Sequence, residues 1–190
     1  MGTIVVSDNL SLDGVIQDPV GDEGFARGGW VGLIQDRPEL AKLTFDETMT
    51  ADAMLMGRRT YEWFAARWPS RTGGLADRLN GMPKYVVSST LEHPDWNNSM
   101  VVTGDVLDQV SKLKAELEGN IVIPASTRIV RTLMEHDLVD AMWLKVFPVV
   151  LGGGDRLFGE TSDKKLMRLV EMRILDGDTT YLALERVRAA

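Results

Sequence analysis

The sequence predicts an α/β protein whose central sheet is mixed: mostly parallel, with antiparallel strands at its C-terminal side. Two observations lead to this prediction. Short apolar segments rich in valine or isoleucine alternate with amphipathic helical segments as far as residue 137, which is the pattern of β–α–β units. The later segments follow one another as strands, and Asp176-Gly177-Asp178 between the last two has the composition of a hairpin turn. We expect residues 1–190 to form a single domain, because this length suits one core.

The expected strands are recognised by their composition and length. The first five are too short for helices and rich in apolar side chains, which suits strands buried on both faces. They lie at residues 3–7, 53–56, 85–89, 100–103 and 120–124. Three more strands, expected to provide the antiparallel part of the sheet, lie at residues 139–151, 166–175 and 179–188.

Four helices are expected between these strands, at residues 37–49, 58–68, 105–117 and 126–137. Pro38 stands near the start of the first, where proline is tolerated, and Asp105 and Ser126 are N-cap candidates for the last two. Residues 17–33 contain five glycines and one proline, which predicts an irregular loop. A long loop in a compact domain is often functional, although a mobile surface loop explains the same composition.

The composition argues against several classes of function. The net charge is −7 and no basic block is present, so we expect no nucleic-acid partner. There is no cysteine, and the two histidines lack a ligand spacing, so we expect no metal site and no thiolate chemistry. No apolar run is long enough to span a bilayer, and the first residues do not resemble a signal peptide. We therefore expect a soluble, cytoplasmic protein without a membrane partner.

The clearest candidate site is Gly57-Arg58-Arg59-Thr60, where a predicted strand becomes a predicted helix. The free N–H groups and positive dipole at a helix start attract anions, glycine permits close approach, and an arginine can grip a phosphate in a forked geometry. An ordinary turn with two solvated arginines explains the same residues, and this motif alone favours that simpler interpretation somewhat.

Other strand ends carry weaker signals. Ser88 and Ser89 leave one strand, and Ser126 and Thr127 lead from another strand into a helix; both pairs offer hydroxyl donors to an anion. Residues 151–155 read LGGGD but lack the Lys-Ser/Thr ending of a phosphate loop. Asp13 could donate a proton or anchor a heterocycle, whereas its spacing to Gly14 alone favours a tight Asp-Gly turn.

Taken together and in order, these motifs resemble the dihydrofolate-reductase-like family, specifically the reductase domain of bacterial bifunctional riboflavin-biosynthesis deaminase–reductases and its stand-alone relatives. The motifs are SLDG (11–14), GGW (28–30), ADAMLMGRRTYEWF (51–64), PKYVVSST (83–90), LVDAMWLKVFPVVLGGGDRLF (138–158) and YLALERV (181–187). The resemblance implies a three-layer fold with about eight strands and helices on both faces. It also implies NADPH as hydride donor, a small nitrogen heterocycle as acceptor, and a homodimer.

The resemblance also implies roles for individual residues. The cofactor-binding candidates are Gly57, Arg58, Arg59, Thr60, Ser88, Ser89, Ser126, Thr127 and Arg128. Asp13 is the first candidate for a catalytic or orienting acid, by its match to SLDG, and Asp46 is the second, while Ser11 and Trp30 are expected to contact the substrate. The chain departs from the family at Pro124-Ala125, where glycine usually faces the pyrophosphate, and this departure lowers the expected affinity for the cofactor.

Three functions follow from these expectations. The first is an NADPH-dependent reductase resembling 5-amino-6-(5-phosphoribosylamino)uracil reductase of riboflavin biosynthesis. The second is a dihydrofolate or pterin reductase. The third is a non-catalytic nucleotide-binding or assembly module on the same fold. The zinc deaminase motif of the bifunctional proteins requires cysteine, so this chain does not contain it.

Overall fold

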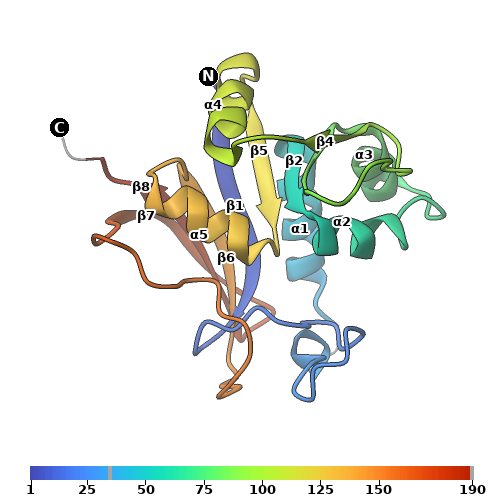
Figure 1. The fold of residues 1–190 in the computed structure, drawn as a ribbon. Helices are drawn as coiled ribbons and strands as arrows, with labels where there is room; N and C mark the ends of the chain where they lie inside the picture. The colour runs from blue at the N-terminus through green and yellow to red at the C-terminus, as the bar shows by residue number, and fades with distance from the viewer. Residues whose placement is uncertain (34–35, 189–190) are drawn as a thin grey trace.

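The structure is a computed structural model that describes residues 1–33 and 36–188. One eight-stranded sheet forms its centre, with the spatial order β4-β3-β2-β5-β1-β6-β8-β7 (Figure 1). The strands are β1 Thr3–Ser11, β2 Ala51–Gly57, β3 Lys84–Val87, β4 Ser99–Val102, β5 Asn120–Pro124, β6 Ala141–Phe147, β7 Met167–Leu175 and β8 Thr179–Arg186. The first six pair in parallel and the last two pair antiparallel, which confirms the predicted mixed sheet.

Helices cover both faces of the sheet, so the predicted three-layer architecture is also confirmed. They are α1 Pro38–Thr50, α2 Arg58–Ala65, α3 Gly74–Gly81, α4 Val106–Glu116 and α5 Thr127–Glu135, with a short 3-10 helix, η1, at Trp30–Leu33. Figure 1 shows α4 and α5 in front of the sheet, and their apolar stripes pack on Ile4, Val6 and Ile123. No helix within the described residues is long and apolar enough to cross a bilayer.

Several element boundaries differ from the sequence-based expectations for identifiable reasons. The helix predicted at 58–68 ends at Ala65, and α3 was not expected because it is only eight residues long with glycine at both ends. The strand predicted to reach residue 151 ends at Phe147, because Pro148 has no N–H to donate to a ladder. β1 extends to Ser11 rather than residue 7, since polar residues interrupt its apolar pattern.

The unequal lengths of neighbouring strands position the site. β1 pairs with β5 only as far as Ser7, opposite Pro124, but it pairs with β6 as far as Ser11, opposite Phe147. The sheet therefore opens on the β5 side of β1, at the carboxyl end of both strands. β2 and β5 lie on one side of β1 in the sheet, and β6 lies on its other side. The opening is therefore a topological switch point, where α/β sheets bind ligands.

Candidate functional site

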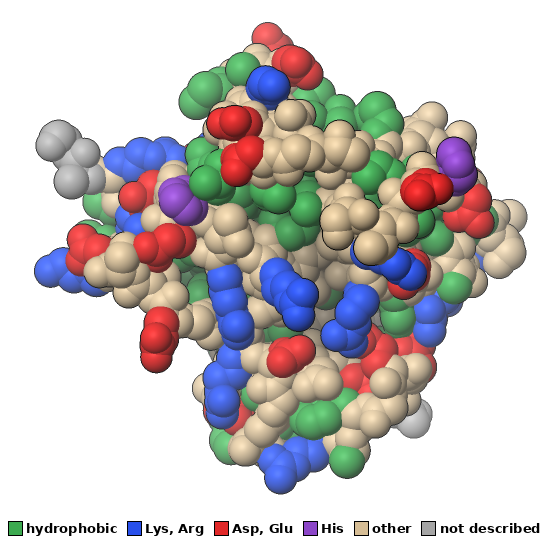
Figure 2. All heavy atoms as spheres, viewed as in Figure 1, with side chains coloured by type: hydrophobic (Ala, Val, Ile, Leu, Met, Phe, Trp, Pro, Cys, Tyr) green, Lys and Arg blue, Asp and Glu red, His purple; other side chains and the backbone are tan. Residues whose placement is uncertain are grey.

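A cleft of about 1790 Å³ lies at the carboxyl ends of the parallel strands. Small-molecule pockets usually measure about 300–1,000 Å³, so this cleft has room for a dinucleotide together with a small second ligand. Figure 2 shows the outer part of this face, where lysine and arginine side chains gather across the middle of the view. The nine residues predicted to bind a cofactor all line the cleft: Gly57, Arg58, Arg59, Thr60, Ser88, Ser89, Ser126, Thr127 and Arg128.

The starts of α2 and α5 meet in the cleft through one chain of hydrogen bonds. The Gly57 N–H donates to Ser126 Oγ over 3.0 Å, Ser126 Oγ donates to Thr60 Oγ1 over 3.1 Å, and Thr60 Oγ1 donates to the Ala125 carbonyl over 3.2 Å. The first N–H groups of a helix have no acceptor within that helix. The two helix starts therefore present their amide donors and their positive dipole ends to one volume.

Arginine side chains surround these helix starts. Arg58 Nε contacts Glu62 Oε1 at 2.6 Å, and the same guanidinium donates to Thr90 Oγ1 over 2.7 Å. Arg59 contacts Glu23 at 3.3 Å, and both of these ion pairs are exposed. Arg128 forms no ion pair within residues 1–33 and 36–188. An anion that enters the cleft can replace Glu62 or Glu23 as the partner of these arginines. This exchange loses little stability, because exposed ion pairs contribute little to the free energy of folding.

Ser88 lies on the far rim of the cleft and stabilises the loop after β3. Its Oγ accepts the N–H groups of Thr90, over 3.1 Å, and of Leu91, over 3.0 Å. Its own hydroxyl proton remains able to donate to a ligand, and Ser89 beside it also lines the cleft. This rim therefore supplies neutral hydroxyl groups next to the Arg58 guanidinium, which reaches Thr90 in the same loop.

Ala125, one of the two residues at which the sequence departs from the expected glycine, adopts the left-handed backbone conformation. Its φ is +44°, a region that costs a residue with a Cβ roughly 1–2 kcal/mol. The strain is held by the contacts of the β5–α5 loop, since the Ala125 carbonyl accepts from Thr60. The departure from glycine at this position is therefore a real cost in this chain, located beside the anion-binding donors.

The inner end of the cleft carries carboxylates rather than arginines. Asp8, on β1, is only 7% exposed and lines the cleft where β1 continues beyond the end of β5. Its Oδ1 accepts the Asn9 N–H over 3.0 Å, while its Oδ2 is buried and has no hydrogen-bond partner among the described residues. Burial raises the pKa of Asp8 from 3.8 to about 7, against the opposing effects of the Lys145 charge and backbone N–H groups.

A buried ion pair lies on the other side of β1. Lys145 Nζ is 2.7 Å from Glu47 Oε2 and donates to Ser7 Oγ over 2.7 Å, and Ser7 Oγ donates to the same Glu47 oxygen over 2.9 Å. Glu47 Oε1 is buried and accepts no hydrogen bond within 3.5 Å from residues 1–33 or 36–188. Because neighbouring side chains of a strand alternate between faces, Ser7 faces this pair and Asp8 faces the opposite side. All four residues line the cleft.

Tyr181, on β8, lies beside Glu47. Burial and the neighbouring Glu47 carboxylate both raise the pKa of its hydroxyl, so it stays protonated and able to donate. The inner end of the cleft thus combines Asp8, a carboxyl group of raised pKa, with the buried ion pair of Glu47 and Lys145. Such a set is suited to proton transfer.

The structure does not bring the four predicted catalytic and substrate residues into the cleft. Asp46 is exposed and pairs with Lys42 at 2.6 Å on the outer side of α1, so its neighbour Glu47 is the residue of that helix that faces the site. Trp30 is 2% exposed, packs edge-on against Phe147 and donates its Nε1–H to the Gln17 carbonyl. It therefore belongs to the core beneath η1.

Ser11 and Asp13 form a structural anchor rather than a cleft wall. Asp13 accepts the N–H groups of Leu151, over 3.0 Å, and Gly152, over 2.9 Å, and it also accepts from Ser11 Oγ. The Leu151 N–H and the Ser11 hydroxyl are the main causes that lower the Asp13 pKa to about 2. Asp13 thus holds the 151–155 loop in place, which agrees with the simpler interpretation of its motif.

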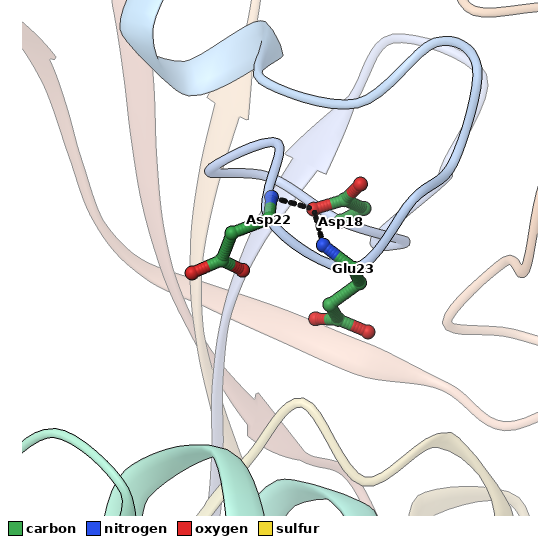
Figure 3. A group of neighbouring side chains, drawn as sticks. All are labelled: Asp18, Asp22 and Glu23. Atoms are coloured by element: carbon green, nitrogen blue, oxygen red, sulfur yellow. Dashed lines mark hydrogen bonds between the residues drawn. The ribbon is translucent and has the colours of Figure 1, made fainter.

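Three acidic side chains gather in the glycine-rich loop, but protein donors already engage them. Their carboxylate oxygens lie within 4.8 Å of one another (Figure 3). Asp18 accepts the N–H groups of Asp22, Glu23 and Phe25, Asp22 accepts from Trp63 Nε1, and Glu23 pairs with Arg59. The cluster therefore orders the loop over the mouth of the cleft, and we assign no metal to it.

Sequence reasoning missed the residues of the inner end. Asp8, Glu47 and Lys145 are far apart in the chain, and only the parallel pairing of β1 with β6 and the packing of α1 bring them together. One local signal was available. Ser7-Asp8-Asn9 is a run of polar residues inside a strand that is otherwise buried, and Lys145 is the single charge in an apolar strand. A buried polar residue marks either a structural pair or a site.

The comparisons with known proteins agree with the architecture. The family model of RibD C-terminal domains matches residues 3–181. The protein YyaP of Bacillus subtilis (strain 168) is 25% identical over 175 residues, covering 90% of this chain and 87% of that protein. A putative riboflavin biosynthesis protein from Shewanella sp. PV-4 superposes with a TM-score of 0.78 at 22% identity, covering 98% and 99% of the two chains. Dihydrofolate reductase from Enterococcus faecalis, solved with NADP(H), gives 0.62 at 16% identity, covering 97% and 96%.

Proposed function

The chain belongs to the family of RibD C-terminal domains, and on this premise we propose that it is a reductase that transfers a hydride from NADPH to a small nitrogen heterocycle. The family supports a reductase of the RibD type in general. The proposed acceptor resembles the ribosylamino-pyrimidine reduced in riboflavin biosynthesis. The compartment in which we expect this reaction is the cytoplasm.

The observation that supports this proposal best is the division of one cleft into two chemically different ends. The outer end offers the amide donors of α2 and α5, hydroxyl groups and guanidinium groups, a donor set that fits the phosphates of a dinucleotide. A Cβ built on Gly57 would lie 3.8 Å from Ile129, so packing does not fill this turn. The inner end offers the buried Asp8 and Glu47, which suit the recognition of a nitrogen heterocycle by its N–H groups.

In this proposal, different residues bind the phosphates and align the two helix starts. Arg58, Arg59 and Arg128 balance the negative charge of the phosphates, and Thr60 and Ser126 hold the two helix starts in register. The reduced nicotinamide supplies the hydride when it is bound. Burial of the inner end keeps water away from the reacting atoms and strengthens the electrostatic contacts there.

A direct binding measurement tests the proposal. Trp63 and Trp68 both line the cleft, so a bound dinucleotide is expected to quench the tryptophan fluorescence of the protein. We expect NADPH to bind with a dissociation constant in the micromolar range. Absence of binding at millimolar NADPH would refute the reductase.

The alternative with a specific observation in its favour is a nucleotide-binding module without catalysis. Ala125 places a methyl group and a strained backbone beside the helix start that should approach the pyrophosphate. NADPH that binds but is never oxidised, whichever pyrimidine or pterin is offered as acceptor, would favour this module.

We also propose a homodimer formed through β7. This strand is at the edge of the sheet, and Leu169, Val170, Met172 and Ile174 are each more than half exposed. An exposed apolar edge strand favours association, and the same strand of a second copy would pair with its free N–H and C=O groups and pack beside its apolar side chains. Light scattering should give twice the chain mass for the wild type, and Met172→Glu should give the monomer; a monomeric wild type at the same concentration would contradict the proposal.

A further inference from the structure

We propose that Asp8 is the catalytic acid of the cleft, donating a proton from Oδ2 to the acceptor, and that the Glu47–Lys145 pair acts as its positioning group. This inference rests on the proposed reductase function. It assigns the proton to a residue of β1 rather than to Asp13 or Asp46, both of which the structure places outside the cleft.

The carboxyl group of Asp8 is held at one oxygen and open at the other, and unlike Glu47 it forms no ion pair among the described residues. Oδ1 is held by the Asn9 N–H, and the Ala125 N–H also faces the carboxyl group, so the side chain is fixed. Oδ2 is buried and has no partner among the described residues. Leaving a buried oxygen unsatisfied is unfavourable, and a proton on Oδ2 that a bound ligand accepts would remove that cost.

The surroundings of Asp8 keep a proton available near neutral pH. Its own strand contributes only the uncharged Ser7 and Asn9, and the β5–α5 loop contributes the Ala125 N–H. From β6 the Lys145 ammonium acts on Asp8, and from α1 comes Glu47. Burial dominates these effects and raises the Asp8 pKa to about 7, which is the value that general acid catalysis at neutral pH favours.

Glu47 is less suited to donate the proton. Its Oε2 already accepts from Lys145 Nζ and from Ser7 Oγ, so this oxygen is engaged within the protein. The pair instead fixes a positive charge behind β1. That charge offsets part of the burial effect on Asp8 and stabilises the carboxylate that Asp8 becomes.

The step balances as follows. The acceptor carbon of a C=N or C=O bond gains the hydride supplied by reduced nicotinamide, and the acceptor is reduced by two electrons. The Oδ2–H bond of Asp8 breaks as an N–H or O–H bond forms on the heteroatom. Asp8 is left as a carboxylate, which the Lys145 charge on the other side of β1 stabilises, and a proton from solvent restores it before the next turnover.

The test follows the carboxyl carbon of Asp8 directly, by ¹³C NMR of the full chain labelled at aspartate. We expect one resonance with a midpoint near pH 7 that disappears in Asp8→Asn. Saturating NADP⁺ should lower that midpoint by at least one pH unit, because a positively charged ring beside the acid favours the carboxylate. In Glu47→Gln/Lys145→Met, which removes both charges together, the midpoint should rise.

The outcomes separate this inference from the proposed function. A midpoint below pH 5 in the free protein would overturn the assignment of Asp8. So would a midpoint that does not move although tryptophan quenching shows that NADP⁺ has bound; in that case the reductase itself would stand. If neither NADP⁺ nor NADPH quenches the fluorescence, the proposed function fails first and the role of Asp8 fails with it.

Discussion

The two ends of the cleft hold charged groups in opposite ways. At the outer end, Arg58 and Arg59 lie in exposed ion pairs that can be exchanged for a ligand. At the inner end, Asp8, Glu47 and Lys145 are each at least nine-tenths buried; Glu47 and Lys145 compensate each other's charge, and burial raises the pKa of Asp8. The outer end can therefore change without affecting the fold, whereas the inner end is part of the core.

This difference teaches where binding and stability can be separated. Exposed ion pairs contribute little to folding, so the outer arginines are available for binding. A buried pair with one partner removed leaves an uncompensated charge, so the inner residues resist substitution.

Lys145→Met should cause the largest loss of stability. It leaves Glu47, which is 9% exposed, as an unpaired buried charge, and we expect the free energy of unfolding to fall by about 3–5 kcal/mol. Urea unfolding followed by circular dichroism measures this loss. Glu47→Gln/Lys145→Met is the matched control and should recover most of the stability; equal losses in the two variants would mean that packing of the lysine stem matters, and not charge.

Asp8→Asn should change how stability depends on pH. Below pH 3.8 the wild-type carboxyl is protonated in both the folded and the unfolded chain, so it has no effect. Between 3.8 and about 7 the unfolded chain loses the proton while the folded chain keeps it, so wild-type stability falls as pH rises. Above pH 7 the variant should be more stable than the wild type by up to about 4.5 kcal/mol, since the pKa is raised by about three units and each unit corresponds to about 1.4 kcal/mol.

The measurement compares urea unfolding of the two proteins at pH 4 and pH 8. Other groups contribute equally to both proteins and cancel in the difference. A variant that is less stable than the wild type at pH 8 would show that Asp8 is a structural carboxylate, which contradicts its raised pKa.

Arg58→Ala should weaken NADPH binding with little effect on folding. Loss of a charge-assisted contact with a phosphate costs roughly 1.5–3 kcal/mol, which corresponds to about 10- to 150-fold in the dissociation constant. Arg168→Ala is the matched control, since Arg168 is also an exposed arginine in an ion pair but lies on β7, outside the cleft. Equal affinities for the two variants would show that no phosphate is held at the start of α2.

Ala125→Gly should produce the smallest effect, and a favourable one. Glycine adopts a φ of +44° without strain, which recovers roughly 1 kcal/mol, partly offset by the greater freedom of the unfolded chain. Removing the methyl group also opens the backbone to a pyrophosphate. We expect tighter NADPH binding by fluorescence titration at nearly unchanged stability; weaker binding would indicate that the methyl group contacts the ligand.

The sequence predicts the residues of the outer end of the cleft but not those of the inner end. Both outcomes have the same physical reason. Gly57 to Thr60 are consecutive residues at a strand-to-helix junction, so their chemistry is local and the motif can be read directly. Asp8, Glu47 and Lys145 meet only through tertiary pairing, and no spacing in the chain reveals that. The mixed sheet was predictable, because the periodicities of strands and helices are local as well.

The predicted site residues that lie outside the cleft have a common explanation. Asp46 and Glu47 are neighbours, but successive residues of a helix point about 100° apart, so a choice between them needs the orientation of α1. Asp13 matches a motif whose role in this chain is to hold the 151–155 loop. A motif identifies which residues recur, while only the fold shows which of them reach the cleft.

Because the edge of β7 is uncovered, the melting temperature of the protein should depend on its concentration. If two copies share this edge, each chain gains part of its folding free energy from association, and the melting temperature rises with protein concentration. Every stability difference above then needs a fixed chain concentration. A melting temperature that stays constant over a hundredfold dilution would show that the edge is tolerated without a partner.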